Sequence, residues 1–303
     1  CGKKPSDAVD MAKGTQKEST VYYSCNSEIS TRFGEEWCVF NIYHCTFKSI
    51  HSSTENGGAL YITNKREGAS GNIIIFESTF ESCESKNGGA IYIKTSQYVR
   101  HYNITKCIFK NNRAITSSSS YLINAEANTV EGFGGAIYFE AAFGIITECE
   151  FNNNVASNGN DILYNDNAQK AHKSNQLGVD NNKFIRNNDE STTHSMIYVH
   201  VEANSQFSFK NNEITTTTNS AALFDCAAGA KEGGLWTFSD NCISSNDIKI
   251  YASDSLKAII PDDSFTTCTN KPTTPTEPTT PTTPTEPSKP TEPSQDPSDV
   301  YCG

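Results

Sequence analysis

The stretch NGGAIYI at residues 87–93 decides the fold, because the chain returns to it at unequal intervals. It is preceded by NGGALYI at 56–62 and followed by FGGAIYF at 133–139. Looser copies lie at 159–164, 194–199, 220–225 and 246–251. Aligned, the copies give a column of branched apolar residues: Leu60, Ile91, Ile137, Ile162, Ile197, Leu223 and Ile248. A phrase repeated in this way predicts that one corner is built again in each unit of a repeat architecture.

A second phrase alternates with the first, and its clearest copies are CIFKNN at 107–112 and CEFNNN at 149–154. Its copies align in two columns that are three residues apart. The first column reads Phe47, Phe80, Phe109, Phe151, Phe184, Phe209 and Ile243. The second column reads Ile50, Cys83, Asn112, Asn154, Asn187, Asn212 and Asn246. Members of the first column are 25 to 42 residues apart, which is the period of a solenoid and not of a helical heptad.

Alternating apolar runs, such as NIIIFESTF at 72–80, precede the phenylalanines and indicate short strands. Strands of this kind cannot bury a face alone, but they can when they are stacked as rungs. The sequence therefore predicts an all-β fold, a parallel β-helix of about seven coils. Asparagine is expected at one tight bend, where it tolerates the left-handed conformation and its amide bonds the next coil, and Gly-Gly at another bend.

Composition divides the chain into three parts. Residues 1–20 lack the repeat and are expected to form a flank or cap, and residues 21–268 hold the predicted β-helix. Residues 269–303 are rich in Pro and Thr, with Pro at every third position from Pro272 to Pro293. That spacing predicts a disordered, extended segment, either an O-glycosylated stalk or a plain linker. Residues 115–133 are expected to protrude from one corner as a loop.

Charge and cysteine content limit the function. The net charge of −11 without a Lys/Arg cluster argues against nucleic acid or an anionic membrane as a partner. The 11 cysteines lack the paired spacing of a zinc site, so an extracellular location is expected, with a free or externally bonded thiol. The chain starts with Cys1 and has no apolar run for a signal peptide or membrane span. We therefore expect a fragment of a longer precursor.

The alternation of Gly-Gly-Ala-Ile with Phe-x-x-Asn resembles the polymorphic outer membrane protein repeat family. The first motif lies at 57–60, 88–91 and 134–137, and the second at 109–112, 151–154, 184–187 and 209–212. The resemblance covers residues 38–250 and implies a right-handed β-helix at a cell surface, as in bacterial adhesins and similar proteins of parasitic protists. Bacterial members end in a membrane barrel, whereas a Pro/Thr-rich tail follows the repeats here, which favours a protist-type member whose membrane anchor lies beyond Gly303.

Two kinds of surface site are predicted. The candidate binding residues are the tyrosines that follow the branched column, with Phe224 in register: Tyr61, Tyr92, Tyr138 and Tyr198. If the branched column forms the core, alternation places these rings on the outer face as a strip for sugars or a protein. The alternative is that they lie inside or only favour the strand conformation. Asn103-Ile104-Thr105 is a glycosylation sequon.

The cysteines near the corners allow two interpretations. Cys45, Cys107 and Cys149 stand two residues before a phenylalanine of the first column. Neighbouring coils bring such thiols within disulfide range, but they also fit as small buried apolar residues. The pairs Cys25 with Cys38 and Cys226 with Cys242 look like bridges in a cap or loop, although spacing does not fix connectivity.

Enzymes are the rival class, because parallel β-helices also include polysaccharide lyases and hydrolases. Such chemistry needs clustered carboxylates, and the candidates are Asp262-Asp263 outside the repeats and Asp161 and Asp247 at corners of non-neighbouring coils. The six histidines share no column. We therefore predict no catalysis, metal or cofactor. The sequence favours a cell-surface adhesin or antigen that binds a host-cell or matrix protein or glycan, with a structural coat component and a lyase-like enzyme as alternatives.

Overall fold

The computed structural model describes residues within the first 268 positions. The described segments are 8–10, 20–25, 28–29, 33–36, 39–64, 73–95, 101–115, 132–140, 143–166, 176–187, 195–201, 206–216, 222–226, 235–244, 249–251 and 259–268. The chain divides into two compact units, Cys1–Lys271 and Pro272–Gly303. The predicted stalk therefore lies outside the described residues.

Three sheets account for nearly all of the described structure. Sheet A consists of β1 (Ala8–Asp10), β2 (Thr20–Cys25), β5 (Val39–Tyr43), β8 (Ile73–Phe76), β12 (His101–Thr105), β16 (Phe143–Thr147), β19 (Gln176–Asp180), β22 (Gln206–Lys210) and β25 (Leu235–Ser239). Sheet B consists of β3 (Glu28–Ile29), β6 (Thr46–Lys48), β9 (Thr79–Glu81), β13 (Ile108–Lys110), β17 (Glu150–Asn152), β20 (Lys183–Arg186), β23 (Glu213–Thr216), β26 (Asn241–Ile243) and β27 (Phe265–Thr267). Sheet C consists of β4 (Phe33–Glu36), β7 (Leu60–Asn64), β11 (Ile91–Thr95), β15 (Ile137–Glu140), β18 (Ile162–Asp166), β21 (Ile197–Val201) and β24 (Phe224–Cys226). A short pair, β10 (Glu84–Ser85) with β14 (Arg113–Ala114), and a 3-10 turn, η3 (Asp262–Ser264), complete the described elements.

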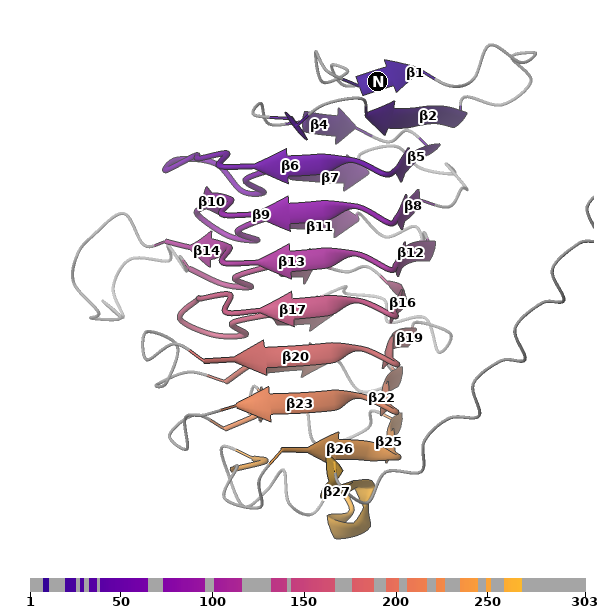
Figure 1. Cartoon of the computed structure of the whole chain (residues 1–303), viewed down its shortest axis with the longest axis vertical. Helices are drawn as coiled ribbons and strands as arrows, with labels where there is room; N and C mark the ends of the chain where they lie inside the picture. Colours follow the sequence, from indigo (N-terminus) through magenta and orange to yellow (C-terminus); the bar gives the residue numbers. More distant parts are fainter. Residues whose placement is uncertain are drawn as a thin grey trace, which may run out of the picture. The chain divides into compact units, whose positions relative to one another are not determined.

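The chain visits sheets A, B and C in turn and returns one rung further along the stack, which confirms the predicted parallel β-helix (Figure 1). Sheet C has seven strands, one for each complete coil from β2–β4 to β22–β24. In Figure 1 the front strands point left, those behind point right and the chain descends, so the coil is right-handed. Among the described pairings, only β1 with β2 is antiparallel, at the N-terminal end of sheet A.

Like side chains stack on one another inside the coils. The rings of Phe47, Phe80, Phe109, Phe151 and Phe184 are buried, and successive centroids are 5.0 Å apart. The branched column from Leu60 to Ile197 is also fully buried. Period-two alternation sends every second residue of a strand inward, so the repeat in sequence becomes one continuous apolar core.

Hydrogen-bonded side chains close the corners beside sheet B. The side-chain amide of Asn112 donates to Asn154 Oδ1 at 2.9 Å, as the column of asparagines predicts. The left-handed conformation, however, falls one residue earlier, at Asn111 (φ 55) and Asn153 (φ 53). The predicted bend is therefore shared between two residues, one that turns the backbone and one that bonds the next coil.

The predicted columns shift in the last coils. Phe209 lies in sheet A opposite Val179, and Ile214 continues the phenylalanine column opposite Phe184. Asn212 belongs to the corner before sheet B, where Asn182 and Asn241 bond to it. FSFKNN at 207–212 resembles CIFKNN, but Phe207 and Phe209 both point inward from β22, so this copy ends a strand of sheet A.

Two further positions of the predicted columns differ. Phe224, and not Leu223, pairs with Ile197 in sheet C, so Asp225 takes the place after Tyr198 that was predicted for Phe224. Asn187 is exposed, and its backbone N–H donates to Asn153 Oδ1, because β20 continues past the bend found in earlier coils. Ile248 and Asn246 lie outside the described residues.

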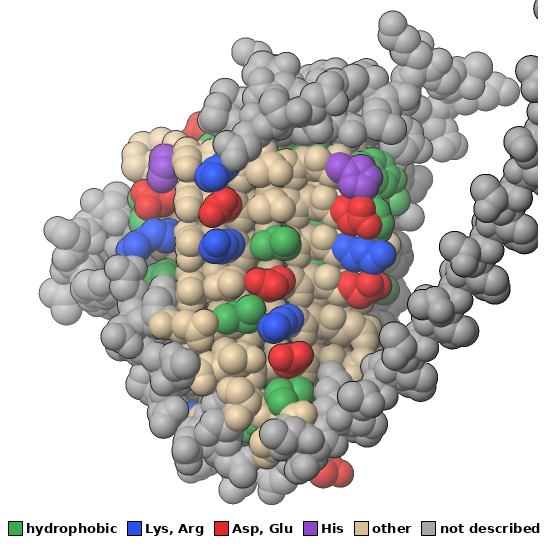
Figure 2. Space-filling model, in the orientation of Figure 1, with side chains coloured by type: hydrophobic (Ala, Val, Ile, Leu, Met, Phe, Trp, Pro, Cys, Tyr) green, Lys and Arg blue, Asp and Glu red, His purple; other side chains and the backbone are tan. Residues whose placement is uncertain are grey.

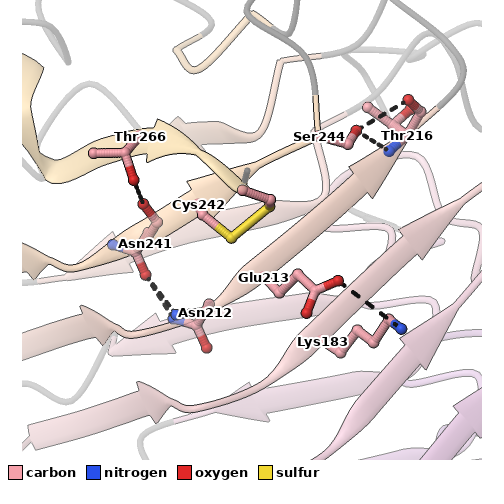
Figure 3. Close-up of a disulfide and its surroundings, with 9 residues drawn as sticks. Lys183, Asn212, Glu213, Thr216, Asn241, Cys242, Ser244 and Thr266 are labelled. Atoms are coloured by element: carbon pink, nitrogen blue, oxygen red, sulfur yellow. Dashed lines mark hydrogen bonds and ion pairs between the residues drawn. A yellow bond between two sulfur atoms is a disulfide. The ribbon is translucent and has the colours of Figure 1, made fainter. Parts of the chain in front are cut away.

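A disulfide closes the C-terminal end of sheet B. Cys242 in β26 is bonded to Cys268, which follows β27, so the predicted pairing of Cys242 with Cys226 is wrong (Figure 3). The two Cα atoms are 4.7 Å apart, because β27 pairs with β26 in parallel and brings the two residues together. In Figure 3 Asn241 beside the bridge is bonded to Asn212 of the preceding coil.

Replacing Cys268 with alanine is expected to lower the free energy of unfolding by about 3 kcal/mol, because the bridge closes a loop with a sequence separation of 26. Urea unfolding followed by circular dichroism measures the loss. Cys242→Ala should cost a similar amount, and the double variant should lose no more than the worse single one. A double variant whose loss is the sum of the two single losses would contradict a shared role for the two sulfurs.

Candidate functional site

The candidate tyrosines lie on the outer face of sheet C, as alternation predicts. Tyr61, Tyr92 and Tyr138 are in register on β7, β11 and β15, and Leu163 separates them from Tyr198. The ring centroids of Tyr61 and Tyr92 are 5.5 Å apart, and those of Tyr92 and Tyr138 are 5.1 Å apart. The structure thus brings three of the four predicted binding residues together in one continuous row.

This row is not an open strip. Tyr92 is 4% exposed and Tyr138 is 8% exposed, and together with Leu163 they form a second apolar cluster outside the core. Tyr61 and Tyr198 at its edges are half-buried. Of the two interpretations, a solvent-exposed strip therefore does not describe the central two rings, and binding by the row stays a prediction. Side chains this well covered contribute packing, and a ligand reaches at most the edges of the row.

Polar partners hold the phenol groups of the row in place. The Tyr92 hydroxyl donates to Glu140, which also pairs with Lys94, and the Asn165 amide donates to the Tyr138 hydroxyl at 3.2 Å. Burial raises the pKa of Tyr92, and the hydrogen bond to Glu140 adds to the shift. Burial also raises the pKa of Tyr138 to about 12. Both phenols are therefore protonated at neutral pH and act as hydrogen-bonding groups, not as bases.

Asn103 lies on the outer face of sheet A. Its side chain is exposed on β12, in register with Ile74 on one side and with Ile145 on the other. Ile145 is 52% exposed, and the Thr105 hydroxyl donates to Asn103 Oδ1 at 2.5 Å. The sequon thus presents its asparagine outward, as glycosylation requires, and its use stays a prediction.

The cysteines that stand two residues before a buried phenylalanine differ in their bonding state. Cys107 and Cys149 are buried free thiols in neighbouring coils, and the Cys107 backbone N–H donates to Cys149 Sγ at 3.4 Å. Cys45 is instead disulfide-bonded, so the expectation of a buried thiol is wrong there. Cys83 is a third buried thiol, and burial raises its pKa to about 12. A thiol held protonated by burial is a poor nucleophile, which favours a packing role for Cys83. The pairing of Cys25 with Cys38 lies outside the described side chains.

Asp161, one candidate carboxylate, belongs to a buried ion pair. It takes the inward position held by Ala59, Ala90 and Ala136 in earlier coils, and its Oδ2 lies 3.6 Å from Nη2 of Arg186. Both side chains are 1–2% exposed, so no substrate reaches them. Burial raises the pKa of Asp161 to about 6, and Arg186 and the Asn154 amide oppose that shift.

The remaining candidate carboxylates form no described site. Asp263 is exposed within η3, whereas Asp247 and the side chain of Asp262 lie outside the described residues. Within the described segments, no group of three or more His, Cys, Asp or Glu side chains is placed to hold a metal ion. In the same part of the chain, no helix is long and apolar enough to cross a membrane.

The outer face of sheet B carries ordered charge. Its side chains fall into rungs of alternating sign, which Figure 2 shows as bands of purple and blue alternating with red. We call this surface the banded face, and its ionisable residues are His44, Lys48 and His51 in the first rung; Glu77, Glu81 and Glu84 in the second; Lys106, Lys110 and Arg113 in the third; Glu148 and Glu150 in the fourth; Lys183 in the fifth; and Glu213 in the sixth.

The acids of the second rung lie between basic residues of the first and third rungs. Glu81 Oε2 is 3.5 Å from Lys48 Nζ, and its Oε1 is 3.9 Å from Lys110 Nζ. Glu77 is likewise flanked by His44 and Lys106, at 3.1 and 3.9 Å. The sequence-based prediction considered the columns of apolar residues and missed this column of charged residues. The signal was present, because residues one place after the buried phenylalanines read Lys48, Glu81, Lys110.

Comparison with known proteins adds no family: no family model, curated protein or solved structure matches the chain. The resemblance to polymorphic outer membrane proteins therefore stays an expectation. The function has to be argued from the arrangement of the chain itself.

Proposed function

We propose that this chain is a non-enzymatic surface adhesin or antigen, a protist-type relative of the polymorphic outer membrane proteins, that presents loops on a rigid β-helix. The Pro/Thr-rich sequence after the coils would hold it away from a cell surface. Its ligand would be a protein or glycan of a host cell or matrix. In this proposal the coils form a rigid support, and the segments that join the strands bind the ligand.

One observation carries this proposal. Ile115 and Gly132 stand at the two ends of residues 116–131, which lie outside the described residues. The Ile115 N–H donates to Ser85 O at 2.8 Å, and the Gly132 N–H donates to Lys86 O at 2.9 Å. The two residues that flank this segment are thus bonded to two adjacent residues of the preceding coil. An insertion attached in this way can vary without changing the register of the coils around it.

Binding of the full chain to cultured epithelial cells tests the proposal. A variant with 116–131 replaced by a short Gly/Ser linker is expected to lose at least about tenfold in affinity, because binding loops attached to a scaffold carry most of the contacts. A variant with the same 16 residues scrambled controls for bulk and should lose as much. Unchanged binding by both variants, with native circular dichroism, would remove the loop from the proposal. Absence of saturable binding by the parent chain would favour the alternative, a coat component.

A further inference from the structure

We infer that the banded face is a self-association surface, through which two copies of this chain pair face to face with their coil axes antiparallel. The inference is independent of the adhesin proposal. It rests on the order of the charges and on the openness of the face. Figure 2 shows the central rungs uncovered, and the side chains of Lys48 and Lys110 are 42% and 48% exposed.

Symmetry decides which pairing the bands allow. A closed pair has a two-fold axis, and two rigid faces meet either with coil axes parallel or with coil axes antiparallel. In the parallel pair every rung faces its own copy, so that like charges meet. In the antiparallel pair, an axis between the second and third rungs places the second rung opposite the third and the first opposite the fourth, so that rungs of opposite sign meet. The alternation therefore selects the antiparallel arrangement.

The same symmetry fixes the residue contacts. This axis runs along the strands of sheet B. Residues at one position along the strands therefore face residues at the same position in the second copy. Glu81 then lies opposite Lys110 of the second copy, and Glu77 lies opposite Lys106. At the edge of the face, Glu84 lies opposite Arg113. Every such contact occurs twice in the pair, so one charge reversal disturbs two contacts at once.

The size of the face predicts weak, salt-sensitive pairing. The first four rungs overlap in this pair, and at strand spacings of about 4.8 Å and rises of about 3.3 Å per residue between the outer columns they cover about 450 Å² of each copy. A total of about 900 Å² is smaller than most specific interfaces and is typical of weak association. Exposed ion pairs also contribute little individually and are screened by salt. We therefore expect association at micromolar concentrations and low ionic strength.

The apolar centre of the face fits this arrangement. Ile108 is 41% exposed on the third rung and lies beside Thr79 of the second rung within its own copy. In the antiparallel pair Ile108 meets Thr79 of the other copy, so no charge is buried against it. On sheet A, Asn103 belongs to a different face, and a glycan there would leave the pairing surface open.

Analytical ultracentrifugation of the full chain tests the inference. We expect a monomer–dimer equilibrium at low salt that weakens at least about tenfold between roughly 0.05 and 0.5 M NaCl, because the Debye length shortens. Glu81→Lys and Lys110→Glu should each weaken self-association by a further factor of about ten, since like charges then meet twice. Asp263→Lys makes the same charge change as Glu81→Lys at an exposed position in η3, outside the six rungs of the banded face, and should behave as the parent chain.

Mixing the Glu81→Lys and Lys110→Glu variants gives the decisive result. In a mixed pair, the lysine introduced at position 81 of one copy faces the glutamate introduced at position 110 of the other. The second contact pairs the native Lys110 with the native Glu81, so opposite charges meet at both places. We expect the mixture to form dimers about as strongly as the parent chain. Each variant is checked for native circular dichroism. A parent chain that stays monomeric at low salt, variants that dimerise unchanged, a mixture that fails to recover, or oligomers that grow beyond dimers would each overturn the inference.

Discussion

Asp161→Ala is expected to lower the free energy of unfolding by about 3–5 kcal/mol, even though alanine is what earlier coils carry at that corner. The substitution removes the carboxylate that faces the buried Arg186 guanidinium. Arginine does not lose its proton in proteins, so its charge stays in an apolar interior. The Asn154 amide also loses Asp161 Oδ1 as an acceptor at 2.9 Å. Chemical denaturation at pH 7 measures the effect.

The partner substitution and the double variant identify the cause. Arg186→Met should cost less than Asp161→Ala, because an isolated carboxyl group can take up a proton and become neutral. The double variant Asp161→Ala/Arg186→Met should return to within about 1 kcal/mol of the parent, since apolar side chains then fill the site. If the double variant is as unstable as Asp161→Ala alone, the loss comes from packing and the charge argument fails.

Gly89→Ala is expected to cost at least about 3 kcal/mol in unfolding free energy, and several degrees in Tm, because the new methyl group meets only backbone. A Cβ at this position lies 2.1 Å from Gly135 O and 2.5 Å from Arg113 O. Both atoms belong to the next coil, which is held by its own hydrogen bonds and cannot move alone. Thermal unfolding followed by circular dichroism measures the shift.

Gly178→Ala is the matched control for that substitution. A Cβ there meets the ends of two flexible side chains, Asp180 Oδ2 and Ser208 Oγ, both at 3.3 Å. Its effect should be less than about 1 kcal/mol in either direction, because lost backbone freedom in the unfolded chain offsets the contact. Equal losses from Gly89→Ala and Gly178→Ala would show that any added methyl group is harmful, and close coil spacing would not be the reason.

The two glycines of each Gly-Gly-Ala corner therefore do different work. Gly88 has a φ of 64°, which few other residues adopt, whereas Gly89 is required by the approach of the next coil. Sequence reasoning attributed both to the bend. In the fifth coil the second position is Asn160, which is buried and accepts a hydrogen bond from the Ala156 N–H at 2.8 Å. The second glycine of the corner can thus be replaced by a residue with a side chain, as Asn160 shows in the fifth coil.

The fold was predictable because its signal is a long-range repeat of buried residues. The two predicted columns, from Phe47 to Phe184 and from Leu60 to Ile197, do stack inside the coils. The alternation along each strand and the repeat from coil to coil both place these residues inward, over many rungs. The prediction fails at Phe209, where a strand of sheet A carries the same local phrase. Local resemblance cannot show which side of a corner a phenylalanine occupies.

The candidate sites were less predictable for two physical reasons. Burial of an outward ring such as Tyr92 depends on what covers the outer face, and the repeat does not encode that. The buried ion pair of Asp161 and Arg186 joins two coils, so neither residue alone indicates that the pair exists. A signal did exist, because Arg186 is in phase with the inward Phe184 and Asp161 stands in the alanine column. Comparing the charged residues at inward-facing positions of neighbouring coils would have found the pair.

The bridge between Cys242 and Cys268 also determines how the molecule responds to mechanical tension. A pull applied to the chain beyond residue 268 reaches β26 directly through the two sulfur atoms. Residues 243–267 are bypassed and carry none of that force while the bridge is intact. Load therefore enters a strand that is bonded to the coil before it, where Asn212 and Asn241 are linked through both backbone and side chain. Peeling of the last strand, the easiest way to unravel a stack from its end, is blocked by a covalent bond.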